Sequence, residues 1–225
     1  MGAKGNNRHM KRLASPRYMK LTRKQSKFVP KPSAGRHTLE NSIALLTFVK
    51  EKLELARNSR EARKAITQGK IKVNGKGIKD TKFALGIGDI VEIVPAALSY
   101  EIVPSDYGVM GKREVKSNSR IVKVIGKYKA EGNVDMIRLI SGENLKCDKK
   151  EIAVNDSVVI EAGKVKDVAK LEEGAKCRVI KGIHAPEEGT IKKITKGTAT
   201  RTATAKIEGK NSSFETVVEN IMAIK

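Results

Sequence analysis

The sequence predicts an α+β chain that is rich in β-strands and divided into four consecutive parts. Three observations support this prediction. The N-terminal stretch carries charge of one sign, two short helical patterns precede an Asn-Gly turn, and short alternating patterns fill the rest. We expect an extended basic arm over 1–38, a domain of helices on a small sheet over 39–95, a central β-rich domain over 96–173, and a last β-rich segment over 174–225.

The first 39 residues contain eleven Lys and Arg and no Asp or Glu, within a chain of net charge +21. Such a segment repels itself and has little apolar surface to bury, so we expect it to take a fixed shape only around a dense anion. The phosphates of RNA or DNA are the usual anion. Its prolines and glycines break any long helix, so a basic amphipathic membrane anchor is disfavoured.

Composition excludes several other classes. Four Phe, four Tyr and no Trp disfavour a platform on which successive bases stack. Cys147 and Cys177 lack CxxC spacing and the three histidines are scattered, so two buried thiols in a reducing cytoplasm are a better interpretation than a metal site or a disulfide. No apolar run has the length of a membrane span, and no apolar region of a secretory signal follows the basic start.

Two helices are predicted after the arm. The first begins after Thr38, a candidate N-cap, and places apolar residues over 39–49 on one broad face. The second begins at Ser59 as N-cap and ends before Gly69, a candidate C-terminal stop.

A hairpin and a strand complete this domain. Lys70–Val73 alternates between polar and apolar residues, Asn74-Gly75 favours a tight turn, and Ile90–Val94 predicts a further strand. Short strands follow over 120–125, 134–140, 157–161 and 164–168. In the last segment, similar short patterns predict strands over 176–181, 190–194, 201–207 and 214–224.

Residues 56–93 resemble the S-four RNA-binding domain, through the strings Ser59–Ile66, Gly69–Lys76 and Gly88–Ile93. The resemblance implies a helix packed on a small sheet, with the basic helix face and the next strand presented to structured RNA. Solvated surface charge is the alternative for these cations. The residues expected to contact RNA are Arg57, Arg60, Arg63, Lys64, Lys70, Lys72 and Lys76.

Residues 174–194 are similar to the KOW motif, a strand–loop–strand unit of a small Src-homology-three-like barrel in ribosomal and transcription proteins. Gly182 and Gly189 are expected at turns with unusual dihedral angles. Ala185-Pro186 stands where the family often has a further loop glycine. An ordinary pair of strands joined by a loop would give much the same pattern. We also expect Lys181 to contact RNA.

The strings His9–Pro16 and Lys31–His37 resemble the N-terminal signature of the archaeal and eukaryotic small-subunit ribosomal protein family "S four e". Its order of parts is basic arm, S-four domain, central β domain and KOW barrel, so the resemblance covers essentially the full chain. Tyr18-Met19 replaces a tryptophan that the family often has after the first proline. Because the sequence stops at Lys225, without the basic tail of eukaryotic members, the chain looks like the archaeal form.

This resemblance implies an arm that threads between ribosomal RNA helices. His9 and His37 are candidates to stack on RNA or hydrogen-bond to it, and incidental neutral histidines in a flexible segment are an equally good interpretation. The arm residues expected to contact RNA are Lys4, Arg8, His9, Lys11, Arg12, Arg17, Lys20, Arg23, Lys31, Arg36 and His37.

The function implied is that of a structural constituent of the small ribosomal subunit, located in the cytoplasm, that binds ribosomal RNA through phosphates and shape. The expected partners are that RNA and neighbouring ribosomal proteins, with no membrane, small-molecule substrate or homo-oligomer. A translation or transcription factor that binds RNA transiently is the alternative. An RNA-modifying enzyme subunit is disfavoured, because the sequence contains no GxxxxGK[ST] or GxGxxG motif and suggests no Ser/His/Asp set. We therefore expect no catalytic residue, metal or cofactor.

Overall fold

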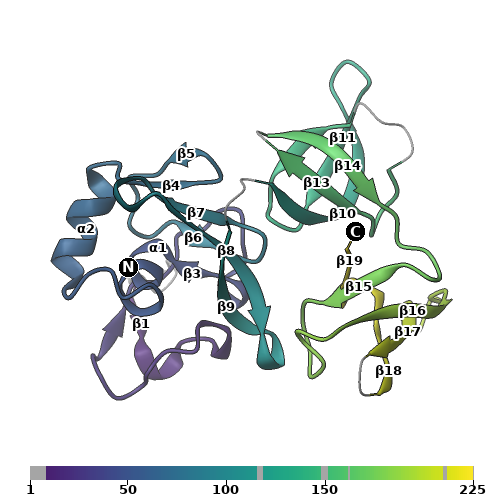
Figure 1. Cartoon of the computed structure of the whole chain (residues 1–225), viewed down its shortest axis with the longest axis horizontal. Coiled ribbons are helices and arrows are strands. Elements are labelled where there is room, and N and C mark those ends of the chain that lie inside the picture. Colours follow the sequence, from purple (N-terminus) through teal and green to yellow (C-terminus); the bar gives the residue numbers. More distant parts are fainter. Residues whose placement is uncertain (1–8, 116–118, 148–151, 162, 210–211, 225) are drawn as a thin grey trace, which may run out of the picture.

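The computed structural model describes residues 9–115, 119–147, 152–161, 163–209 and 212–224. The described chain forms three modules, each built around a five-stranded antiparallel sheet, and the arm packs on the first of them (Figure 1). We call residues 39–115 the first module, 119–169 the central module and 174–224 the C-terminal module. No helix in the described part of the chain is long and apolar enough to cross a membrane.

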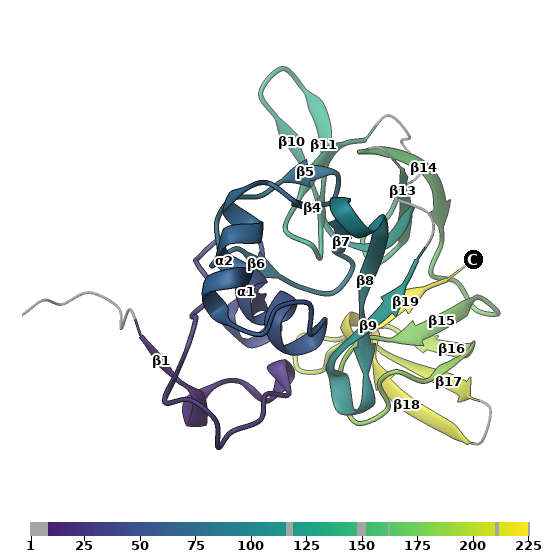
Figure 2. The same ribbon diagram turned by 60° about the vertical axis from the view of Figure 1, so that its left-hand side comes forward.

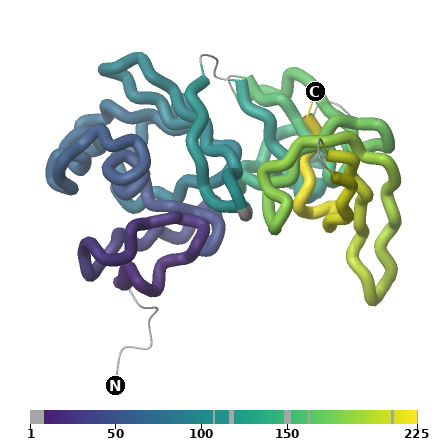
Figure 3. The backbone as a smooth tube through the Cα atoms, turned by 60° about the horizontal axis from the view of Figure 1, so that its bottom comes forward, coloured from purple at the N-terminus to yellow at the C-terminus, as the bar shows by residue number. Residues whose placement is uncertain are grey.

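The arm is folded rather than wholly extended. Strands β1 (Met10–Lys11) and β2 (Phe28–Val29) pair antiparallel, with 3-10 turns at Arg12–Ala14 and Arg17–Met19 between them. Figures 2 and 3 show this segment, in purple, lying beside the first module.

Four arm residues enter the core of the first module: Met10, Tyr18, Met19 and Val29. The arm over residues 9–38 is thus anchored by apolar contacts, which the prediction of a segment ordered only by RNA did not include. Burial of these four apolar side chains stabilises the folded arm, although the high charge of the segment led us to expect little apolar burial.

The first helix begins later than predicted. Residues Leu39–Asn41 form a 3-10 turn and β3 (Ile43–Ala44) pairs with β6 (Ala84–Leu85). Only then does α1 (Leu45–Thr47) begin, and it continues as a wider π-type turn over Phe48–Lys52. Thr38 makes no side-chain cap. The strand pairing of Ile43 and Ala44 takes precedence over the helical pattern, although the predicted apolar face is buried.

The second helix and the hairpin follow their local signals. Helix α2 spans Ser59–Thr67, with Asn58 rather than Ser59 at its N-cap. Gly69 ends it with φ +73°, and Asn74 and Gly75 turn the chain with φ 53° and 78° between β4 (Ile71–Val73) and β5 (Lys76–Gly77).

The sheet of the first module extends beyond the predicted boundary at residue 95. Its strand order is β5-β4-β7-β8-β9, where β7 is Ile90–Ile93, β8 is Leu98–Ser105 and β9 is Val109–Glu114. Residues 98–114 thus pair with the first module, and we place the division between modules after residue 115.

The central module contains the four predicted strands and one more. Its sheet has the order β12-β11-β10-β13-β14. The strands are β10 (Arg120–Ala130), β11 (Val134–Leu139), β12 (Asn144–Lys146), β13 (Ser157–Glu161) and β14 (Lys164–Ala169).

The C-terminal module has the strand order β18-β17-β16-β15-β19. The strands are β15 (Lys176–Val179), β16 (Glu188–Thr195), β17 (Thr204–Gly209), β18 (Ser213–Val217) and β19 (Ile221–Ala223). Gly182 has φ +98° as expected. Gly189 is not at a positive φ. A side chain there would instead collide with the Glu208 carbonyl on the paired strand β17.

The modules are in contact with one another. Ile180 and Met222 of the C-terminal module belong to the same apolar cluster as the arm and the first module. The central and C-terminal modules also have apolar clusters of their own. Two polar contacts also join the modules: Arg36 pairs with Glu143, and Lys123 donates to the Val218 carbonyl.

Candidate nucleic-acid interface

Helix α2 presents a cationic face. Ala62 and Ile66 are buried against the first module, so Arg60, Arg63 and Lys64 point away from the core and are exposed. Residues three apart are neighbours on a helix surface, which places Arg60 and Arg63 about one turn apart on the same side. The Glu61 carboxylate accepts a hydrogen bond from the Arg57 backbone N–H at 3.1 Å and steadies the helix start.

The β4–β5 hairpin continues this face. Along β4, Ile71 and Val73 are buried and Lys72 is exposed, because successive side chains point to opposite sides of a strand. Lys70 and Lys76, which flank β4 and its turn, are exposed as well. Helix α2 leads directly into the hairpin; in Figure 1 α2 lies at the left of the first module, and β4 and β5 lie along its top.

We call the exposed cations of α2 and this hairpin the S4 cationic surface. Among the described residues, none of them forms an ion pair with a carboxylate. Their charge is therefore available to a partner. A cluster of uncompensated Lys and Arg on one side of a domain is typical of surfaces that bind nucleic-acid phosphates. The surface comprises Arg57, Arg60, Arg63, Lys64, Lys70, Lys72 and Lys76.

Arg12 is an internal anchor, which corrects its assignment as an RNA contact. Its side chain is 3% exposed, and its guanidinium pairs with both Glu51 oxygens at 2.6 and 3.0 Å. It also donates to the Ser26 hydroxyl and the Thr22 carbonyl. The hydrogen bond to Glu51 raises the pKa of Arg12 above its ordinary value, against the opposing effect of burial. Arg12 thus fixes the arm to the π-type turn of the first module.

Arg36 and His37 also point inward. Arg36 pairs with Glu143 of the central module, and His37 Nε2 lies 2.8 Å from Asp89 Oδ2 with its side chain 5% exposed. The His37 ring lies against Asp89 and Gly86 of the first module, so the structure does not leave it open for stacking on a base. Arg36 is half-buried and already has a carboxylate partner.

Asp89 is the centre of this buried charge network. It accepts hydrogen bonds from Asn74 Nδ2 at 2.8 Å and from the Gly86 N–H at 3.1 Å, and Arg120 Nη1 lies 3.7 Å away. Burial opposes its ionisation, but hydrogen bonds and charge from His37, with smaller effects of Arg36 and Asn74, outweigh burial and lower the pKa of Asp89. The network joins the end of the arm to the first and central modules.

The remaining arm residues divide into three groups. Exposed side chains belong to His9, Lys11, Arg17, Lys20 and Arg23, whereas Lys31 is half-buried. Lys4 and Arg8 lie outside the described residues. The exposed group adds further cations on the arm to those of the first module.

Lys123, which sequence reasoning missed, fastens the central module to the C-terminal module. Its side chain is 2% exposed, and Nζ donates to the carbonyls of Val218, Ile221 and Glu219 at 2.6, 2.8 and 3.2 Å. Burial lowers the pKa of Lys123 to about 8. No local signal identifies it, because Lys123 stands in an ordinary alternating strand and its partners lie about a hundred residues later.

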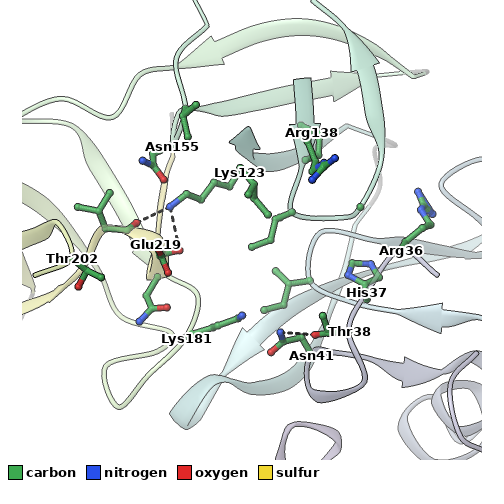
Figure 4. A pocket seen from close by; sticks show the side chains of 18 of the residues that line it. Arg36, His37, Thr38, Asn41, Lys123, Arg138, Asn155, Lys181, Thr202 and Glu219 are labelled. Carbon is green, nitrogen blue, oxygen red and sulfur yellow. Dashed lines mark hydrogen bonds between the residues drawn. The ribbon is translucent and has the colours of Figure 1, made fainter. Parts of the chain in front are cut away.

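A cleft of about 580 Å³ opens beside this contact, at the junction of the three modules (Figure 4). Arg36, His37, Arg138 and Lys181 are among its lining residues. Lys181 is half-buried there, so the structure does not bring it together with the S4 cationic surface. Within the described residues, no group of three or more His, Cys, Asp or Glu is placed to hold a metal ion.

Two family models match the chain. The RS4NT (NUC023) domain matches residues 4–40 and the S4 domain matches residues 45–91. These matches coincide with the arm and with most of the first module.

Relatives align over almost the whole chain. Small ribosomal subunit protein eS4 of Korarchaeum cryptofilum is 31% identical, over 100% of this chain and 96% of the relative. The eS4 protein of Archaeoglobus fulgidus is 35% identical, over 96% and 92%. The crystal structure of the 30S ribosomal protein S4e from Thermoplasma acidophilum is similar with a TM-score of 0.68 and 26% identity, over 82% of this chain and 95% of that chain.

The fold and the exposed cations define a multi-module protein built around an S4 domain with a basic surface. Its class is that of S4-domain proteins extended by an N-terminal arm and further β modules. The chain belongs to the family of small ribosomal subunit protein eS4.

Proposed function

We propose that this protein is a structural constituent of the small ribosomal subunit, in the cytoplasm, that binds ribosomal RNA. The observation that carries the proposal is the alignment with eS4 proteins over 96–100% of the chain, from the arm to the last module. The S4 cationic surface supports it independently, because its side chains are exposed and have no carboxylate partner among the described residues.

Binding is proposed to depend mainly on phosphate contacts and RNA shape. Lys and Arg make up the surface, and these side chains position a protein on the sugar–phosphate backbone without reading sequence. Double-stranded RNA in particular is recognised by shape, because its deep major groove is closed to side chains. Proposed contacts outside the S4 cationic surface are the exposed arm residues Lys11, Arg17, Lys20 and Arg23.

The C-terminal module is proposed to be a KOW-type unit. The antiparallel pair β15 and β16, joined by a loop that turns at Gly182, supports this assignment. The same pair lies in the middle of the sheet, so the loop projects from one end of the module. Neighbouring ribosomal proteins are the partners proposed for the surfaces that RNA leaves open.

Catalysis is not part of the proposal. Relatives that share the full length of the chain carry the name of a ribosomal constituent, which supports a non-enzymatic role. No membrane, small-molecule substrate or homo-oligomer is proposed.

Cosedimentation separates a constituent from a transient factor. The tagged protein is expressed in archaeal cells, and small subunits are washed in high salt and sedimented. A constituent stays in the subunit peak at a stoichiometry of about one. Release of the protein into the supernatant by a wash that retains the other ribosomal proteins would favour the transient factor instead.

A further inference from the structure

One aromatic side chain of the arm is open to solvent. The structure describes all four phenylalanines, and Phe28 is the one that is exposed, at 51%. Phe48 and Phe214 are buried in cores, and Phe83 is half-buried. A single exposed apolar residue is ordinary on a protein surface, so exposure alone assigns no role. The surroundings of Phe28 provide the further argument.

The β1–β2 ribbon fixes the direction in which Phe28 points. Met10 pairs with Val29, and both are buried in the first module. Lys11 pairs with Phe28, and both are exposed. Because side chains alternate along a strand and direct cross-strand partners share a face, burial of Met10 and Val29 holds Lys11 and Phe28 together on the outer face. Phe28 is thus presented by a ribbon anchored in the core.

Cations and a second ring surround Phe28. Lys27 Nζ lies 5.6 Å from the centre of the Phe28 ring, and the His9 ring is 5.9 Å away and tilted by 56°. Residues 9–38 contain no Asp or Glu, so nothing in the arm itself neutralises Lys11 and Lys27. An aromatic ring between cations can accept a base on its face while the cations contact the adjoining phosphates.

We propose that Phe28 stacks on one unpaired base of the small-subunit ribosomal RNA, with Lys11 and Lys27 contacting the phosphates on either side. This inference rests on the proposed function and gives it a defined contact. The scarcity of aromatic residues disfavours a platform on which successive bases stack. A single exposed ring, that of Phe28, can still stack on one base. The cations beside Phe28 and the absence of acidic residues from the arm itself favour RNA over a neighbouring protein as the occupant.

Replacement of Phe28 by tryptophan provides a direct probe, because the natural chain contains no Trp. Phe28→Trp keeps an aromatic face and makes its fluorescence the only tryptophan signal. Titration with transcribed small-subunit ribosomal RNA is expected to quench this emission, at an affinity close to that of the wild type. Emission that stays unchanged while the RNA binds would overturn the proposal.

Phe28→Ala removes the aromatic ring and tests how much it contributes to RNA affinity. Affinity for the same RNA is expected to fall about tenfold. The slope of log K against log salt is expected to remain that of the wild type, because stacking releases no counterions. Val154→Ala removes a comparably exposed apolar side chain, at 49%, from the central module and is expected to leave affinity unchanged.

The outcomes separate this inference from the proposed function. If the wild type fails to bind ribosomal RNA, the proposed function fails with it. If the wild type binds and Phe28→Ala binds equally well, the stacking contact is refuted and the function stands. If Phe28→Ala binds the RNA normally but is not incorporated into subunits, Phe28 faces a neighbouring protein, which also refutes the contact. Unchanged thermal unfolding of each variant shows that the ribbon is intact.

Discussion

Reversing two charges on α2 tests whether the S4 cationic surface binds RNA. Arg60 and Arg63 are exposed, lie one turn apart and have no carboxylate partner among the described residues. Each is therefore free to neutralise a phosphate. Loss of two contacts in Arg60→Glu/Arg63→Glu is expected to lower the salt slope of binding by about two. Together with the added repulsion, it costs about 2 kcal/mol, or about thirtyfold in Kd.

The assay is filter binding or anisotropy with small-subunit ribosomal RNA at several salt concentrations. Lys146→Glu/Lys164→Glu, on β12 and β14, is the matched control, because it changes net charge by the same amount on exposed residues of the central module. We expect this control to lose clearly less affinity than the α2 variant.

Two results would contradict RNA binding by this face of α2. The α2 variant could bind as tightly as the wild type at moderate salt, in which case this helix face is not the contact. The two double variants could also lose affinity equally, in which case binding follows net charge and not a defined surface. Circular dichroism is expected to be unchanged, since both arginines point to solvent.

Three further predictions concern the buried charges. Arg12→Ala leaves Glu51 without its partner and is expected to lower stability by about 3 kcal/mol and to expose the arm to protease, whereas Arg17→Ala, at an exposed site, should change neither. Burial lowers the pKa of Lys123 from 10.5 to about 8, so the unfolded chain keeps this proton between pH 8 and 10.5 after the folded protein has released it. This group therefore adds stability as pH rises across that window, by about 3 kcal/mol in total. Lys123→Met should remove that rise in denaturant unfolding, and a pH profile identical to that of the wild type would contradict the assignment. The pKa of Asp89 is lowered from 3.8, so its ion pairs stabilise the protein above that pH and lose effect as pH falls further. Asp89→Asn should be less stable than the wild type at pH 7, with a gap that narrows below pH 4 in the same assay.

The sequence predicted the elements whose signals are local. Helix α2 follows from its apolar stripe, and its stop at Gly69 and the Asn74-Gly75 turn follow from backbone preferences within a few residues. These predictions are confirmed, whereas the predicted N-cap Ser59 is wrong because Asn58 takes that position. The exposed cations of α2 follow for the same reason, since Ala62 and Ile66 define the buried side of the helix.

Features that depend on distant partners could not be predicted. Ile43 and Ala44 form a strand because residues 84 and 85 pair with them, which delays the first helix. Arg12 looks like any other cation of the arm, and only the fold brings Glu51, 39 positions away, to its guanidinium. The first module ends after residue 115 and not at the predicted residue 95, because β8 pairs with β7. Composition does not reveal this strand pairing.

The same reason explains the histidines and Phe28. His37 is enclosed because Gly86 and Asp89, about fifty residues later in the chain, lie against its ring, and no neighbouring residue signals this contact. Phe28 is exposed because Val29 takes the inward position in a ribbon of two residues per strand. In a strand of two residues, the pairing with the partner strand decides which side chain is buried and which is exposed.

Crosslinking in assembled small subunits, with identification of the peptides attached to ribosomal RNA, tests whether the S4 cationic surface and the arm contact the RNA. We expect RNA adducts on the segment 57–76, which contains the S4 cationic surface, and on the arm between residues 9 and 31. Adducts confined to residues 120–224, with the lysines of 57–76 open to chemical acetylation in the intact subunit, would contradict this expectation.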